Sequence, residues 1–157
     1  SKQMIIMGDS AGGQIALAFV QQLKKDSEPQ PSHIVLISPV LDATFSNPEA
    51  RKYEKEDPML GIEGSKYLVN LWAGDAPLDH YKLSPMYGDL EDLGHITITT
   101  GTKETLYPDA VKFSTMLNEK GINHEFIPGY SLFHIYPIFP IPERERFLEQ
   151  LKRIILK

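Results

Sequence analysis

Cysteine is absent from this 157-residue sequence, so disulfide bonds, thiolate nucleophiles and cysteine-based zinc sites are excluded. Long apolar runs are absent too, because no stretch approaches the roughly 20 residues that a membrane-spanning helix needs. The first residues also lack the charged stretch and apolar segment of a secretory signal. We therefore expect a cytoplasmic protein without a membrane span.

Positive charge is scarce in the sequence. There are 16 Lys and Arg residues against 21 Asp and Glu, which gives a net charge of -5 and a pI of about 5.5. Proteins that bind duplex nucleic acid present a basic face, so we expect no nucleic-acid partner. Hydrophobic residues make up 41% of the chain, enough for a core. The length corresponds to one domain at roughly 100–200 residues per domain.

Apolar runs alternate with amphipathic stretches along the chain. Strands are predicted at residues 3–7, 33–37, 96–100 and 124–127, and helices at 11–25, at 108–120 and from 142 onward. We expect the first strand to be buried on both faces and helix 11–25 to be buried almost all round. Alternating strands and helices predict an α/β fold, with a doubly wound parallel sheet and flanking helices.

One connection is much longer than the others. Between Ser38 and His95 the chain far exceeds the roughly 2–6 residues that are usual between a helix and a strand. We assign the whole chain, 1–157, to a single domain with an insertion at about 42–94. A helix at 63–73 is predicted within it, and we expect the insertion to lie near the mouth of an active site.

The segment 8–12, Gly-Asp-Ser-Ala-Gly, matches the G-x-S-x-G nucleophile elbow. It lies between a predicted strand and a predicted helix, where a sharp turn would strain and expose Ser10. The two glycines are expected to avoid Cβ atoms that would clash. Backbone N–H groups at the helix start, that of Ala11 among them, would stabilise an oxyanion. A plain tight turn is the alternative interpretation.

A nucleophilic serine needs a base, and sites in parallel sheets lie at the carboxyl ends of the strands. Three of the five histidines stand at strand starts and one lies in the insertion: His33, His95, His124 and His80. Only His134 follows a strand by a few residues. The sequence therefore favours His134 as the base, although a loop histidine packed among aromatic residues would give the same pattern.

The acid that orients the histidine should also follow a strand. Glu104 comes a few residues after the third predicted strand, and we favour it as the acid. Asp109 lies in the first turn of the next helix, where it would complement the helix dipole. Asp42 follows the second strand, so both aspartates remain alternatives. The order Ser10, Glu104, His134 is that of α/β-hydrolases.

The remaining motifs are given structural roles. The Asp-Pro pair at 57–58 is expected to begin a turn or short helix. Trp72 and Phe133 are candidates for lining a substrate pocket, although core packing is an equal alternative. No cluster of His with Asp or Glu has metal-ligand spacing, and no glycine loop matches a phosphate cradle. We therefore expect no metal and no cofactor.

Taken together, several segments resemble one family. Residues 7–13 (MGDSAGG) are similar to the nucleophile segment of the hormone-sensitive-lipase-like branch of α/β-hydrolases, the fold-3 esterases and lipases. The resemblance continues through segments 38–42, 57–60, 84–87 and 101–104. It implies the α/β-hydrolase fold and hydrolysis of carboxylic esters, often short-chain ones, without metal or organic cofactor. The family usually has aspartate where this chain has Glu104.

A second departure from the family concerns the start of the chain. The family carries a His-Gly-Gly-Gly motif well upstream of its serine, which supplies oxyanion donors, and here Ser10 has no such segment before it. The sequence therefore resembles the C-terminal half of a longer hydrolase. We expect strand 3–7 to have an exposed edge, through which the chain could form a homo-oligomer.

These observations together favour a serine carboxylesterase or lipase that works by two-step acyl transfer. Ser10 would attack the ester carbonyl, His134 would take its proton, and Glu104 would stabilise the imidazolium. Two alternatives remain open. One is a serine peptidase of the prolyl-oligopeptidase type, which has the same fold and residue order. The other is a catalytically silent fragment that needs its missing half.

Overall fold

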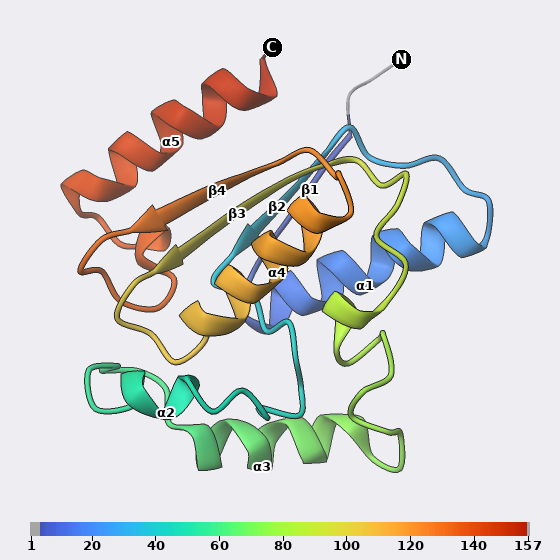
Figure 1. Ribbon diagram of the computed structural model, residues 1–157. Coiled ribbons are helices and arrows are strands. Elements are labelled where there is room, and N and C mark those ends of the chain that lie inside the picture. Colours follow the sequence, from blue (N-terminus) through green and yellow to red (C-terminus); the bar gives the residue numbers. More distant parts are fainter. Residues whose placement is uncertain (1–3, 157) are drawn as a thin grey trace.

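A four-stranded parallel sheet forms the centre of the computed structural model, which describes residues 4–156 (Figure 1). The strands lie side by side in chain order: β1 (Ile5–Asp9), β2 (His33–Ile37), β3 (His95–Gly101) and β4 (His124–Gly129). Each agrees with a predicted strand to within two residues at either end. Gln3, with which the first predicted strand begins, lies outside the described residues.

Helices cover both faces of the sheet (Figure 1). The three longest outside the insertion are α1 (Ala11–Lys25), α4 (Tyr107–Glu119) and α5 (Pro142–Ile155). Helices α1 and α4 pack on one face and α5 on the other. Proline lies in the first turn of both α4 and α5, where its missing N–H has no intrahelical acceptor to lose.

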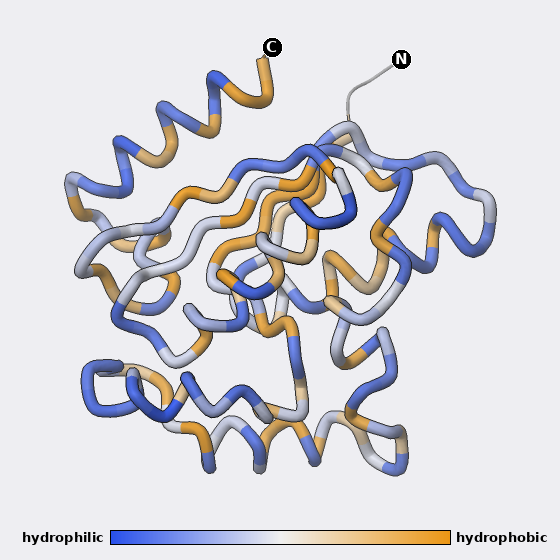
Figure 2. The backbone as a smooth tube through the Cα atoms, in the orientation of Figure 1, coloured by the Kyte–Doolittle hydropathy of each residue, from blue (hydrophilic) through white to orange (hydrophobic). Residues whose placement is uncertain are grey.

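The sheet separates two hydrophobic cores, one on each face, and strand β2 contributes side chains to both. Its side chains alternate, so that Ile34 and Leu36 face α1 and α4 while Val35 and Ile37 face α5. All four are buried. The strands form a hydrophobic centre within a largely hydrophilic outline (Figure 2). A strand that is apolar at every position is thus explained by its place inside a parallel sheet covered on both sides.

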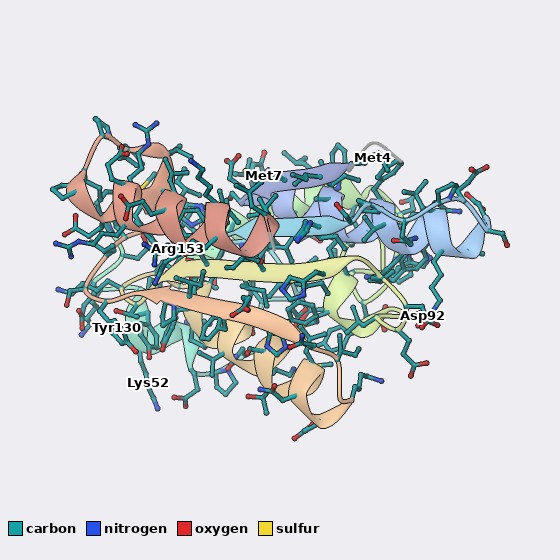
Figure 3. All side chains as sticks on the ribbon, turned by 90° about the horizontal axis from the view of Figure 1, so that it is seen from above. Met4, Met7, Lys52, Asp92, Tyr130 and Arg153 are labelled. Carbon is teal, nitrogen blue, oxygen red and sulfur yellow. The ribbon has the colours of Figure 1, made fainter. Side chains whose placement is uncertain are left out.

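The prediction that strand 3–7 is buried on both faces is wrong for the described part of the chain. Met7 is 51% exposed and Ile5 40% exposed. Among the strands of residues 4–156, β1 pairs only with β2 and is an edge strand, and Figure 3 shows Met4 and Met7 along this outer edge. Helix α1 is likewise half uncovered, since Ile15 and Phe19 are about half exposed. Apolar composition alone cannot tell a central strand from an edge strand.

The insertion between β2 and β3 contains α2 (Ala50–Tyr53), α3 (Ile62–Ala73) and the short 3-10 helix η1 (Pro85–Tyr87). Helices α2 and α3 lie beyond the ends of the strands toward which the arrows point, whereas the later part, with η1, runs back beside α1 to the start of β3 (Figure 1). Apolar side chains attach the insertion to the loop before α4: Val40, Phe45, Ala50, Ile62 and Leu106. The sequence predicted α3 to within one residue, but not α2. Among residues 4–156, no helix is long and apolar enough to cross a membrane.

Candidate active site

Ser10 occupies the turn between β1 and α1 with a strained backbone. Its φ of 53° and ψ of -120° lie in a region that residues with a Cβ rarely adopt. The turn is held by hydrogen bonds at both ends of the residue. The Ser10 N–H donates to the carbonyl of Ile37 at 2.9 Å, and the Ser10 carbonyl accepts from the N–H of Val40 at 3.1 Å.

The glycines around Ser10 do not all serve the same purpose. A Cβ on Gly8 would lie 2.2 Å from the Gly12 carbonyl oxygen, and one on Gly13 would lie 2.8 Å from the Cβ of Pro39. A Cβ on Gly12 would meet nothing within 4 Å. The prediction that both glycines of the motif avoid a clash therefore holds for Gly8 and is wrong for Gly12. Gly13, which lies outside the motif, is the second position where space is short.

His134 lies in the loop between β4 and α5, and its side chain is only 3% exposed. Its Nε2 atom is 3.0 Å from Ser10 Oγ, and its Nδ1 atom is 3.2 Å from Glu104 Oε2. Ser131 and Ile135 in the same loop have positive φ angles of 61° and 50°. This irregular loop brings the imidazole between the serine and the carboxylate.

Glu104 follows β3 and is completely buried. Besides the imidazole, two hydroxyl groups contact its carboxylate. Ser38 Oγ donates to Oε2 at 2.9 Å, and Thr100 Oγ1 donates to Oε1. Because buried polar groups without partners are costly, these two donors help to accommodate the carboxylate inside the protein.

Ser38 also contacts the histidine loop, since its Oγ accepts the backbone N–H of Ile135 at 3.0 Å. One hydroxyl thus connects the carboxylate to the residue after His134. Sequence reasoning missed Ser38 and Thr100. Their position was the available signal, because Ser38 directly follows β2 and Thr100 lies near the end of β3, at the edge of the sheet that holds the site.

Asp42, one alternative acid, binds other groups than the imidazole. Its carboxylate accepts hydrogen bonds from Thr44 N–H at 2.9 Å, from Thr44 Oγ1 at 2.5 Å and from Tyr87 OH at 2.8 Å, and Ser46 Oγ lies 3.3 Å away. Burial alone would raise the pKa of Asp42, but these hydrogen bonds together lower it below its usual value.

Asp109, the other alternative, lies in the first turn of α4 as predicted. Its Oδ1 accepts a hydrogen bond from Asn47 Nδ2 at 2.8 Å. Burial raises the pKa of Asp109 above its ordinary value, and the nearby charge of Asp42 adds to this, while the bond from Asn47 opposes it. Neither aspartate is within hydrogen-bond distance of His134 in the described structure, whereas Glu104 is.

The other histidines lie where the sequence placed them. His33, His95 and His124 are the first residues of β2, β3 and β4, at the end of the sheet opposite Ser10. The ring of His124 is held by Ser114 Oγ at 2.7 Å and by the carbonyl of Ile122 at 3.0 Å. These histidines are therefore remote from the serine.

Ala11 is the first residue of α1, so its N–H has no acceptor within the helix. Beside it lies an apolar cavity of about 240 Å³ formed by α1, by the segment after β2 and by α3. The lining residues are Ala11, Gln14, Ile15, Val40, Leu68, Val69 and Trp72. Trp72 therefore borders the space next to the elbow. Phe133 instead packs edge-to-face on Phe139 at a ring distance of 5.1 Å, on the α5 side.

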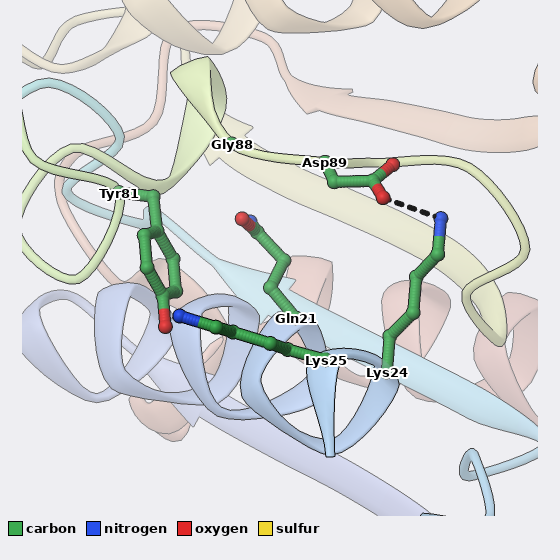
Figure 4. A pocket seen from close by; sticks show the side chains of 6 residues that line it. All are labelled: Gln21, Lys24, Lys25, Tyr81, Gly88 and Asp89. Atoms are coloured by element: carbon green, nitrogen blue, oxygen red, sulfur yellow. Dashed lines mark ion pairs between the residues drawn. The ribbon is translucent and has the colours of Figure 1, made fainter. Parts of the chain in front are cut away.

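Figure 4 shows a larger cavity of about 380 Å³, whose lining does not include Ser10. It is lined by the C-terminal half of α1 and by the chain around Gly88: Gln21, Lys24, Lys25, Tyr81, Gly88 and Asp89. Lys24 Nζ forms an ion pair with Asp89 Oδ2 at 2.6 Å, so much of its charge is neutralised within the wall. Nothing in this cavity resembles catalytic machinery. Nor does any group of three or more His, Asp or Glu side chains in residues 4–156 have the geometry of a metal site.

Comparison with known protein families gives one match over most of the chain. A family model described as alpha/beta hydrolase fold matches residues 1–138. An esterase from Acinetobacter venetianus is 33% identical over 154 residues, which cover 96% of this chain and 50% of the relative. An acetyl-hydrolase from Streptomyces hygroscopicus is 30% identical, over 94% of this chain and 50% of the relative.

The fold of this chain is also similar to that of solved esterase structures. A crystal structure of an esterase from the bacterial hormone-sensitive lipase family superposes with a TM-score of 0.90 and 25% identity. The match covers 96% of this chain and 51% of that one. The chain thus spans about half the length of the relatives it matches. Within that half, the similarity includes the elbow, the insertion and the loops that carry Glu104 and His134.

Proposed function

The chain belongs to the alpha/beta hydrolase fold family, and on that basis we propose that it carries the nucleophile, base and acid of a carboxylic ester hydrolase. One observation carries the proposal. Ser10 Oγ, the His134 imidazole and the Glu104 carboxylate form a continuous hydrogen-bonded series with distances of 3.0 and 3.2 Å. The names of the relatives, esterase and acetyl-hydrolase, support an ester as the substrate rather than a peptide.

The first half of the proposed reaction forms an acyl-enzyme. Ser10 Oγ attacks the carbonyl carbon of the ester while His134 Nε2 accepts the serine proton. The carbonyl oxygen becomes an oxyanion, which the N–H of Ala11 and the positive end of α1 stabilise. The intermediate then expels the alcohol, and His134 gives it the proton that it took from the serine.

The second half repeats these steps with water as the nucleophile. His134 Nε2 takes a proton from water as the water oxygen attacks the acyl carbon of the ester on Ser10. The bond to Ser10 Oγ breaks, the proton returns to the serine, and the carboxylic acid leaves. Ser10 and His134 are then in their starting states.

Glu104 remains ionised throughout the proposed cycle. By accepting a hydrogen bond from the Nδ1–H group it keeps His134 in the tautomer whose Nε2 can act as a base, and it stabilises the imidazolium that forms. Ser38 and Thr100 hold the carboxylate in this orientation. The apolar cavity beside Ala11 suits the hydrocarbon part of a small ester, which α3 would cover on one side.

Covalent labelling tests the proposal directly. A fluorophosphonate probe should label Ser10 in the protein expressed from its complete reading frame. Ser10→Ala should abolish both the labelling and the hydrolysis of p-nitrophenyl acetate. The matched control is Ser27→Ala, since Ser27 is an exposed serine beyond the end of α1 that is opposite Ser10, and it should leave both unchanged. Labelling that survives in Ser10→Ala would contradict the assignment.

A further inference from the structure

Asp57 lies in the insertion, between α2 and α3, yet one of its oxygen atoms binds the segment next to Glu104. Oδ2 accepts the backbone N–H of Thr105 at 2.8 Å and its Oγ1 at 3.1 Å. Oδ1 accepts the N–H groups of Met59 at 2.9 Å and of Leu60 at 3.0 Å. The sequence predicted only that a turn begins here. The structure adds a connection across 48 positions of sequence.

The bond to Thr105 bears directly on Glu104. The N–H of Thr105 and the carbonyl of Glu104 belong to one planar peptide unit, which moves as a whole. When Asp57 holds the N–H, the ψ angle of Glu104 is restrained as well. The direction in which the buried carboxylate leaves the backbone then depends on a residue of the insertion.

Two neighbouring contacts fasten the same pair of segments. Lys103, on the other side of Glu104, lies 3.8 Å from Glu56 in an ion pair between largely exposed groups, which is worth little by itself. Leu106 is buried in the apolar cluster that contains Ile62 of α3. Residues on both sides of Glu104 therefore contact the stretch around Asp57.

A purely local turn does not account for this arrangement. An aspartate that only closes its own turn uses one oxygen for the N–H groups two and three residues ahead, as Oδ1 does here. The second oxygen would be left to water. In this chain that oxygen receives two donors from one residue, and hydrogen bonds to an ionised carboxylate are the stronger kind.

We propose that Asp57 is a positioning residue that acts through Glu104, so that the insertion and the hydrolytic centre are mechanically connected. The inference rests on the function proposed above. It predicts that weakening the bond to Thr105 lowers kcat without a comparable change in KM, since the acid is displaced while the substrate pocket keeps its shape.

The test uses Asp57→Asn in the protein expressed from its complete reading frame. Asparagine has one oxygen, so its amide can satisfy either the turn or Thr105 but not both. We expect kcat for p-nitrophenyl acetate to fall about 10- to 100-fold, as for other small displacements of catalytic groups, with KM within about twofold. The control is Asp79→Asn, an exposed aspartate of the same insertion, which should change kcat less than about twofold.

A double-mutant cycle with Glu104→Gln separates positioning from general damage. If Asp57 acts through Glu104, Asp57→Asn should cost much less when Glu104 is already glutamine. Equal losses in both backgrounds, or no loss in either, would overturn the inference. If Glu104→Gln alone leaves kcat unchanged, it is the role of Glu104 in the proposed function that fails.

Thr105→Val provides a second route to the same answer should Asp57→Asn prevent folding. Valine removes the hydroxyl but keeps the N–H and the turn at Asp57, so we expect a smaller loss of roughly threefold in kcat. This loss should also vanish in the Glu104→Gln background. A loss that persists there would count against positioning.

Discussion

The three acidic residues near the proposed centre are distinguished by what surrounds each carboxylate. Glu104 faces an imidazole and two hydroxyl groups, Asp42 faces hydroxyl and amide donors, and Asp109 faces one side-chain amide. All three are buried. Since only Glu104 contacts His134, the three should differ sharply when each is replaced by its neutral amide.

For activity, Glu104→Gln should be the damaging change. Glutamine cannot carry the charge that stabilises the imidazolium, so kcat should fall about 10³- to 10⁴-fold. Asp109→Asn should cost less than about threefold, because Asp109 contacts Asn47 and not the base. Steady-state hydrolysis of p-nitrophenyl acetate measures both. A greater loss in Asp109→Asn than in Glu104→Gln would move the role of acid to Asp109.

Asp109→Asn should raise the free energy of unfolding at pH 7, whereas a typical substitution of a buried residue lowers it. Burial raises the pKa of Asp109 in the folded state, so the native protein binds more protons than the unfolded chain between the two pKa values. The free energy of unfolding therefore falls as pH rises through that range. Asp109→Asn removes this loss, and its Tm at pH 7 should exceed that of the wild type, with the difference vanishing below about pH 4.

Asp42→Asn is the matched comparison. Hydrogen bonds lower the pKa of Asp42 in the folded state, so its stabilising effect is present at neutral pH and is lost as pH falls through the folded value. Asp42→Asn should therefore lower stability at pH 7 by about 1–2 kcal/mol. Thermal unfolding followed from pH 3 to pH 8 measures both variants. If both substitutions changed the stability at pH 7 in the same direction, the opposite pKa shifts given for Asp109 and Asp42 would be contradicted.

The hydrogen bonds that surround Glu104 and its neighbours could not be predicted from the sequence. That His134 and Glu104 lie close together could be predicted, because each follows a strand and the carboxyl ends of parallel strands meet at one edge of a sheet. Ser38, Thr100 and Asp57 obey no spacing rule with respect to Glu104. Their contacts depend on how loops close in space, which the order of residues alone does not determine.

Secondary structure was more accessible, because apolar periodicity is a local property. The strands and the long helices were predicted to within two residues of their ends, as in α1 at Ala11–Lys25. Burial was harder to predict. Helix α3 leaves Tyr67, Leu68 and Trp72 about two-thirds exposed, and in β1 the side chain of Met7 is 51% exposed although burial was expected. The apolar character of a side chain indicates that its burial is favourable, but it does not indicate which segment packs against it.

The junction of β1 and α1 offers a test at the scale of these elements. Gly8→Ala places a methyl group against the Gly12 carbonyl, so the strand and helix must separate, at a cost of about 1–3 kcal/mol or more. Gly12→Ala meets open space within a helix and should stabilise the fold by roughly 0.5–1 kcal/mol. Urea unfolding of both variants measures the difference. Similar losses would show that the junction is not tightly packed.

For the molecule as a whole, the order of strands explains both the centre and the exposed edge. Four parallel strands in chain order bring the loops after β1, β3 and β4 to one end, where Ser10, Glu104 and His134 meet. The same order leaves β1 paired on one side only. Its edge has no charge or proline between Met4 and Gly8 to prevent another strand from pairing with it.

We therefore expect the 157 residues expressed alone to associate through β1. Light scattering after size exclusion should give a mass above that of the 17.7 kDa chain, increasing with concentration. Met7→Lys should reduce the association, because a charge at an exposed edge opposes strand pairing. Ile138→Lys, an equally exposed apolar position on the 3-10 helix η2 (Tyr136–Ile138), should not. A monodisperse monomer at all concentrations would refute the expectation.

The backbone of Ser10 has a consequence for how this protein can change over time. A serine held at φ 53° and ψ -120° lowers the stability of the fold, by roughly 1–3 kcal/mol for such conformations, and glycine would relieve that strain. Replacing Ser10 with glycine should therefore give a more stable protein that lacks the proposed nucleophile. Chains of this kind that have lost the need for activity should drift to glycine there, whereas those that retain serine keep it against the preference of their own fold.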